Sequence, residues 1–194
     1  MQRYGLALVT APTVEPISTA EAKAHLRVDI SEDDTYIDTL IKASRTYCEN
    51  FLFRRLINST WDLYLDCFPS ILLLPYPPAS SVTSITYVDG AGDSQTLATT
   101  EYATDIRQEP ARIIPAYGKS WPSIRGQNNA VTVRYVAGYG AAATAVPAAI
   151  IHAMKLLIGN WYEQRESVIV GTIATKTPDA VENLLYSHRV MEIS

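Results

Sequence analysis

The chain has 194 residues, of which 47% are hydrophobic and 19% are charged, and its formal net charge is −4. This composition is typical of a folded globular protein and excludes a disordered chain. The mild negative charge argues against non-specific nucleic-acid binding through a dominant basic surface. Because no apolar run is long enough to span a membrane, we expect no membrane partner.

The N-terminal third predicts an extended arm followed by a helical hairpin. Residues 1–16 contain two prolines and few charges, and they predict the arm. Ser18 and Glu21 have the spacing of a capping box, which starts a first helix. Ser31 starts a second helix, and a stripe of large apolar residues in 33–55 occupies one arc of it. A short turn between two such helices predicts a hairpin.

The second predicted helix has two further sides. One carries charges at the four-residue spacing that supports a helix: Asp38, Lys42, Arg45 and Glu49. The other is small and uncharged, which suggests the approach of another backbone: Thr39, Ala43, Thr46 and Asn50.

From residue 60 the period of the hydrophobic pattern changes to two, which indicates β-strands. The expected strands are 61–65, 71–74, 81–88, 95–97, 102–106, 111–114 and 131–136. Short strands separated by proline and glycine turns predict a small antiparallel sheet or barrel. A long loop, 117–129, is expected to display Trp121 and Arg125.

Pro147 starts a further helix, in which Leu156 lies off the main apolar face. The order of helices, strands and helices predicts an α+β fold, in which a helical bundle carries an inserted small antiparallel β domain. The bundle comprises the N-terminal hairpin and the C-terminal helices. The expected boundaries are 17–58 and 146–166 for the helical core, 59–145 for the β domain, and 167–194 for a C-terminal arm with a short helix.

Residues that could carry chemistry do not form a recognised site in the sequence. His25, His152 and His188 have no ligand partner at a metal-binding spacing, so no metal and no cofactor is expected. Cys48 and Cys67 do not form a CxxC pair and are expected to be reduced, structural thiols. The pattern predicts a protein that is not an enzyme.

Several motifs together resemble the head–tail connector (adaptor) proteins of long-tailed bacteriophages and prophages, in the subfamily with a β insertion. They extend from residue 17 to residue 190. In chain order they are ISTAEAKAHLRVD, DDTYIDTLIKASRTYCE, TWDLYLDCFP, LPYPPASSVTSITYVDGAG, ARIIPAYGKSWPSIR, VTVRYVAGYG with VPAAI, and NWYEQRESVIVGTIATKTPDAVENLLYSHRV.

The resemblance implies a structural virion protein without catalysis, located in the neck of a phage with a siphovirus-like tail and made in the host bacterial cytoplasm. It implies a dodecameric ring of this chain that docks beneath the portal protein and continues the DNA channel. Double-stranded DNA would pass through the lumen without specific binding, and the ring would present a surface to the tail-proximal neck or stopper protein. We expect a neutral to acidic lumen, because a basic one would hold DNA by releasing its counterions.

Two sets of contact residues are expected, the first from the resemblance and the second from residue types and helix faces. The portal contact is expected in the C-terminal arm, at Val168, Ile169, Val170, Ile173, Leu184, Leu185, Tyr186, His188, Arg189 and Val190. Contacts with another subunit or neck protein are expected at Thr39, Ala43, Thr46, Asn50, Leu156, Trp121 and Arg125.

Two other readings stay open. The first is a tail-completion or stopper protein of the same neck. The second is a small β-domain binding module or enzyme with its site on loop 117–129, at Tyr117, Trp121 and Arg125. For Trp121 itself, the alternatives are an exposed interface anchor and a ring folded back onto the sheet.

Overall fold

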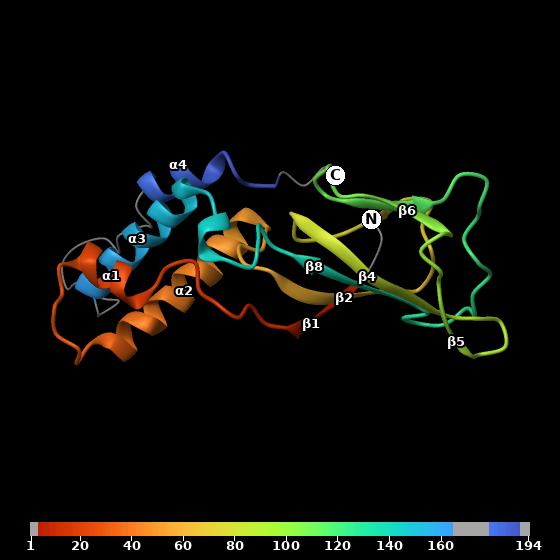
Figure 1. The fold of residues 1–194 in the computed structure, drawn as a ribbon, viewed down its shortest axis with the longest axis horizontal. Coiled ribbons are helices and arrows are strands. Elements are labelled where there is room, and N and C mark those ends of the chain that lie inside the picture. Colours follow the sequence, from red (N-terminus) through yellow and green to blue (C-terminus); the bar gives the residue numbers. More distant parts are fainter. Residues whose placement is uncertain (1–3, 165–178, 191–194) are drawn as a thin grey trace, which may run out of the picture. The chain divides into compact units, whose positions relative to one another are not determined.

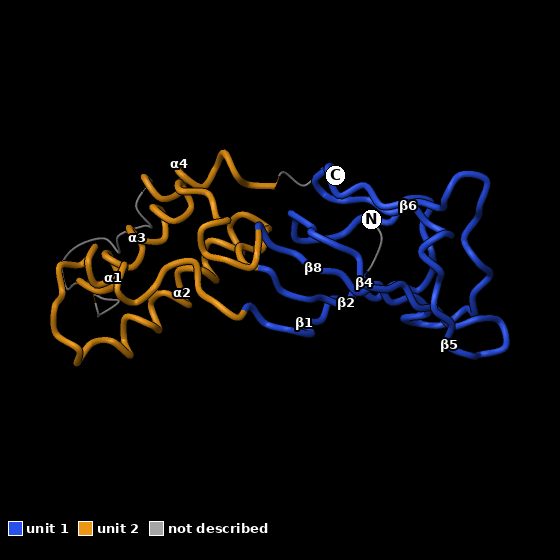
Figure 2. The backbone as a smooth tube through the Cα atoms, viewed as in Figure 1, with its two compact units in different colours: residues 1–12, 58–139, 192–194 blue, residues 13–57, 140–191 orange. Residues whose placement is uncertain are grey.

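The structure is a computed structural model that describes residues 4–164 and 179–190. The described chain forms two compact units (Figure 2). The β unit contains residues 4–12 and 58–139, and the helical unit contains 13–57, 140–164 and 179–190. The described chain therefore passes from the β unit to the helical unit, returns to the β unit at residue 58, and enters the helical unit again at residue 140.

The helical unit contains four α-helices and one turn of 3₁₀-helix in its described residues (Figure 1). They are α1 (Thr19–Leu26), α2 (Asp34–Leu52), η1 (Ala143–Ala145), α3 (Ala148–Glu163) and α4 (Asp179–Tyr186). The predicted capping box is present at α1, because the Glu21 N–H donates to Ser18 Oγ (3.2 Å) and the Ser18 N–H donates to Glu21 Oε2 (2.9 Å).

The core of the helical unit lies where α2 packs against α3 and α4. The apolar stripe of α2 predicted from the sequence is buried, including Ile37, Ile41 and Cys48. Facing residues of the other two helices are also buried: Ile150, Met154, Leu157, Ile158, Val181 and Leu185. Each fully buried Leu or Ile side chain contributes about 1.5–3 kcal/mol relative to an exposed one, so α4 is held by its two core residues.

The β unit consists of two antiparallel sheets. The five-stranded sheet has the order β1-β2-β8-β4-β5, and the three-stranded sheet has the order β3-β7-β6. The strands are β1 (Gly5–Thr10), β2 (Ser59–Leu65), β3 (Leu72–Leu73), β4 (Ala79–Val88), β5 (Ser94–Thr96), β6 (Tyr102–Asp105), β7 (Arg112–Pro115) and β8 (Val131–Ala137). Their inward residues meet in one core that includes Leu63, Val133, Tyr135, Leu72 and Ile113.

The α+β fold class predicted from the sequence is confirmed. Within the predicted extended arm, 1–16, residues 5–10 form β1 and pair with β2 in the sheet. The apolar pattern of GLALVT is short, so the sequence does not distinguish an extended arm from a strand that has a partner 50 or more residues away. Residues 140–145, expected in the β domain, belong to the helical unit.

Candidate interaction surfaces

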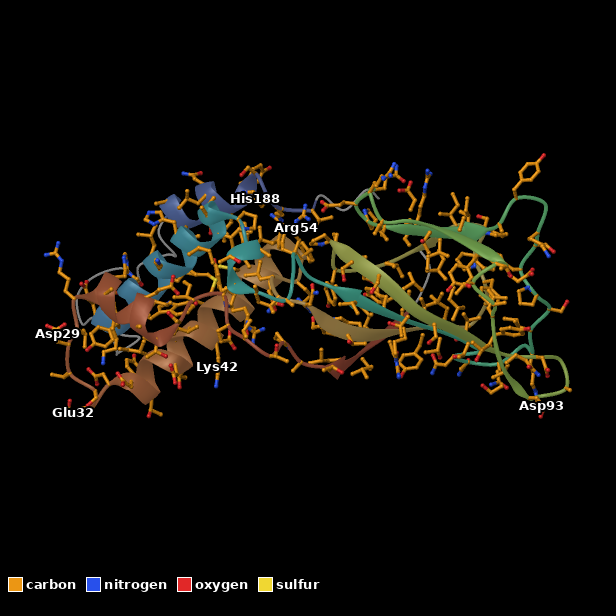
Figure 3. All side chains as sticks on the ribbon, viewed as in Figure 1. Asp29, Glu32, Lys42, Arg54, Asp93 and His188 are labelled. Carbon is orange, nitrogen blue, oxygen red and sulfur yellow. The ribbon has the colours of Figure 1, made fainter. Side chains whose placement is uncertain are left out.

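The small, uncharged side of α2 is exposed along its length. Thr39, Ala43, Thr46 and Asn50 are all exposed, and we call them the small-residue strip. The Thr39 and Thr46 hydroxyls donate to the backbone carbonyls four residues earlier, at 3.0 and 2.9 Å. Both threonine hydroxyl donors are therefore satisfied within the helix. Lys42 projects outward beside it (Figure 3).

The charged side of α2 is partly buried, at Glu49. Its carboxylate is buried, accepts the Leu56 N–H at 3.0 Å, and lies 3.3 Å from Arg45 Nη1 and 3.8 Å from Arg55 Nη1. Arg45 also binds Glu15 at 2.7 Å. Burial raises the pKa of Glu49, although the Leu56 N–H and the two arginines act in the opposite direction.

The C-terminal segment packs on the helical unit. The Val190 N–H donates to the carbonyl of Leu52 at 3.0 Å, and Arg54 Nε donates to the carbonyl of His188 (Figure 3). The Arg189 guanidinium lies over the rings of Phe51 and Phe53, 5.1 and 5.4 Å from their centroids. Since Leu52 ends α2, this segment satisfies one of the carbonyls that a helix C-terminus leaves without an intrahelical partner.

These contacts bear on the expected portal residues. Leu185 is fully buried in the helical unit, so in this conformation it cannot contact a portal protein. His188, Arg189 and Val190 make the contacts given above within the chain, whereas Tyr186 is 60% exposed. Leu184 is half-buried. Val168, Ile169, Val170 and Ile173 lie outside the described residues.

Trp121 folds back onto the β unit. Its indole stacks on Phe68, with ring centroids 4.7 Å apart, and its Nε1–H donates to the carbonyl of Pro69 at 2.7 Å. Of the two alternatives for this residue, the structure shows internal packing. Arg125 is exposed, and Tyr117 is completely exposed. On α3, Leu156 is half-buried.

Loop 117–129 lines neither of the two cavities that stand out in the described chain. These have volumes of about 380 and 340 Å³, and residues of the helical unit line both. Within the described residues there is also no group of three or more His, Cys, Asp or Glu side chains placed to hold a metal ion. None of the described helices is both long and apolar enough to cross a bilayer.

Sequence reasoning missed an exposed apolar surface on the three-stranded sheet. Leu73 and Ile114 point away from the core of the β unit and are 53% and 38% exposed. Ile71, immediately before β3, is 49% exposed, and Ala103 pairs with Ile114 across the sheet. We call these four residues the apolar face. The signal was the run Ile71–Leu74, because an uninterrupted apolar run makes both faces of a strand apolar.

This chain is similar to a family of phage proteins and to chains in solved particle structures. Residues 17–85 match the family described as phage gp6-like head-tail connector proteins. The predicted resemblance to head–tail connectors is confirmed. The connector match covers α1, α2, β2, β3 and the first part of β4. No curated protein matches the chain.

Chains in solved structures of gene transfer agent particles are similar to nearly the whole of this chain. A chain in the neck of an empty gene transfer agent (GTA) particle, computed with C6 symmetry, is 25% identical with a TM-score of 0.79, over 98% of this chain and 97% of that one. A chain in the virion of a native GTA particle is 25% identical with a TM-score of 0.80, over 97% of each chain. A chain in a native GTA neck computed with C12 symmetry is 26% identical with a TM-score of 0.72, over 98% and 97%.

Proposed function

We propose that this chain is the structural subunit of a ring adaptor between the portal vertex of a phage-type head and its tail. The observation that carries the proposal is the match to a chain of a GTA neck over 98% of this chain, with a TM-score of 0.79. Both the helical unit and the β unit take part in that match, so it extends beyond the connector family match at 17–85.

The proposed assembly is a closed ring of twelve copies. The similar neck structures were computed with C12 and C6 symmetry, which supports an arrangement of identical copies around one axis. Rings of this kind need two different complementary surfaces on each copy. The small-residue strip of α2 is a first candidate for one of them, because it is exposed and uncharged.

The proposed ring is a passive conduit for double-stranded DNA. A net charge of −4 per chain suits this role, because a lumen rich in Lys and Arg would retain DNA by releasing its counterions. We propose no catalysis and no cofactor. On its other side the ring would contact the tail-proximal stopper protein, in the neck of a virion assembled after synthesis in the bacterial cytoplasm.

Electron microscopy of this chain with the portal protein from the same genome tests the proposal. We expect twelvefold rings stacked on the portal, and no salt-sensitive retention of double-stranded DNA by the assembled ring. Binding to the tail-tube protein but not to the portal would instead indicate a stopper. Absence of rings, with or without the portal, would contradict the proposal.

A further inference from the structure

The outer surface of the three-stranded sheet carries exposed apolar side chains, unlike the outer side of the five-stranded sheet. Leu72 and Ile113 pair across β3 and β7 and are fully buried, so the core is complete on the inner side. The outer side nevertheless carries the apolar face, with Leu73 53% exposed. Its neighbouring charges, Arg112 and Asp105, pair across β7 and β6 and bond to each other at 3.1 Å.

The five-stranded sheet shows what the same chain does where a sheet faces solvent. On its outer side, the exposed Arg134 covers the buried carboxylate of Asp62, and the two residues pair across β2 and β8 with two bonds of 2.8 Å. Thr86 and Thr132 pair beside them across β4 and β8. An antiparallel sheet that is covered on one side normally has such a polar outer side. The apolar face therefore has the composition of a covered surface.

A second exposed apolar surface lies on β1. This strand is at the edge of the five-stranded sheet, and no strand of the described chain pairs with its outer edge. Leu8 and Val9 are 48% and 43% exposed, and a register shift leaves Val9 without a cross-strand partner. The six residues Gly5–Thr10 include no charge, although exposed edge strands are commonly protected by charged residues or proline.

We propose that the apolar face of one copy packs against β1 of the next copy in the ring. This inference rests on the proposed function. A rotational ring needs two different surfaces that fit each other, and these two are both apolar and exposed. In Figure 1, β6 of the three-stranded sheet and β1 lie on opposite sides of the β unit. One copy can therefore contact a different neighbour through each surface.

Disulfide trapping tests the contact directly. Cys67 is exposed and is first replaced by serine, whereas Cys48 is fully buried, and burial raises the pKa of its thiol to about 12, so it can stay. A chain carrying both Leu73→Cys and Val9→Cys should give a ladder of cross-linked species under mild oxidation. Each single variant alone should give none, and a mixture of the two should give dimers only.

The single variants exclude the main alternative geometry. Dimers from Leu73→Cys alone would mean that two apolar faces meet each other, which overturns the inference. The absence of cross-links in the double variant, in rings that form normally, would overturn it as well.

A charge substitution tests whether the contact matters for assembly. Leu73→Glu places a carboxylate beside Arg112 in the monomer but buries it against β1 in the ring, so we expect at least about a tenfold lower ring fraction. Ser81→Glu, at an exposed position of β4, is the matched control and should assemble normally.

The outcomes separate this inference from the proposed function. Failure of the unsubstituted chain to form rings would contradict both. Normal rings of Leu73→Glu would contradict only the inference. Rings that form normally but no longer bind the stopper protein would assign the apolar face to that partner and also overturn the inference.

Discussion

The environment of Glu49 differs from the one that its place on the charged side of α2 suggests. Glu49 is buried among Glu15, Arg45 and Arg55, next to Cys48, and it receives the Leu56 N–H. The helical pattern places it with Asp38 and Lys42 because four-residue spacing reports only on the helix itself. The segments that bury it come from outside the helix, one before α1 and one after α2. No local pattern contains that information.

The burial of Glu49 predicts a specific pH dependence of stability. Because its pKa is raised in the folded state, the folded chain binds this proton more tightly than the unfolded chain does. The contribution of Glu49 to stability is therefore greatest below its ordinary pKa of 4.5 and falls as pH rises through the raised value. A tenfold difference in proton affinity corresponds to about 1.4 kcal/mol.

Urea unfolding of the unsubstituted chain and of Glu49→Gln, from about pH 4 to pH 8, measures this contribution. Glutamine keeps an oxygen acceptor for the Leu56 N–H but does not titrate. The free energy of unfolding of the unsubstituted chain should fall relative to that of Glu49→Gln as pH rises. A difference that increases with pH would show that the two arginines outweigh burial.

At the scale of elements, the end of α2 and the segment after α4 depend on each other. Arg189 covers Phe51 and Phe53, and Val190 bonds to Leu52. A cation over aromatic rings contributes about 0.5–2 kcal/mol. We predict that Arg189→Ala lowers the local stability of α4 by this amount and leaves the β unit unchanged.

Amide hydrogen exchange measures this effect at the helix itself. Amides of α4 should exchange about 2- to 30-fold faster in Arg189→Ala, whereas Arg189→Lys, which keeps a cation, should lie between the two. The exposed Arg107→Ala in the β unit is the matched control. Unchanged exchange in α4 would show that Val181 and Leu185 alone hold the helix.

The elements were predictable where the pattern is long and local. The apolar stripe of α2 and the capping box of α1 follow from helical spacing, and the structure shows both. β1 was not predictable, because its strand character depends on pairing with β2, far along the chain. The burial of Leu185 likewise depends on how α4 packs. The sequence of a short apolar helix is equally compatible with an arm that contacts another protein. The run Ile71–Leu74 contains the signal for the apolar face, but only the pairing of strands within the sheet shows which side chains point outward.

At the scale of the whole molecule, each unit offers an uncharged exposed surface. The helical unit has the small-residue strip, and the β unit has the apolar face and β1. Contacts in both units would let the proposed ring form between uncharged surfaces. The two sets of surfaces can be tested separately, because substitutions in one unit leave the core of the other intact.

The small-residue strip of α2 can be tested as a contact between copies by adding bulk to it. Ala43 is exposed on α2, so Ala43→Trp should change the free energy of unfolding of the monomer by no more than about 0.5 kcal/mol. If a neighbouring copy packs against the strip, the indole cannot be accommodated and the ring fraction should fall about tenfold or more. Ala24→Trp, at an exposed position of α1, is the matched control for adding the same ring to a helix surface. Sedimentation velocity measures both species. Normal assembly of Ala43→Trp would show that the strip faces solvent in the ring and would leave the β unit to supply the lateral contact.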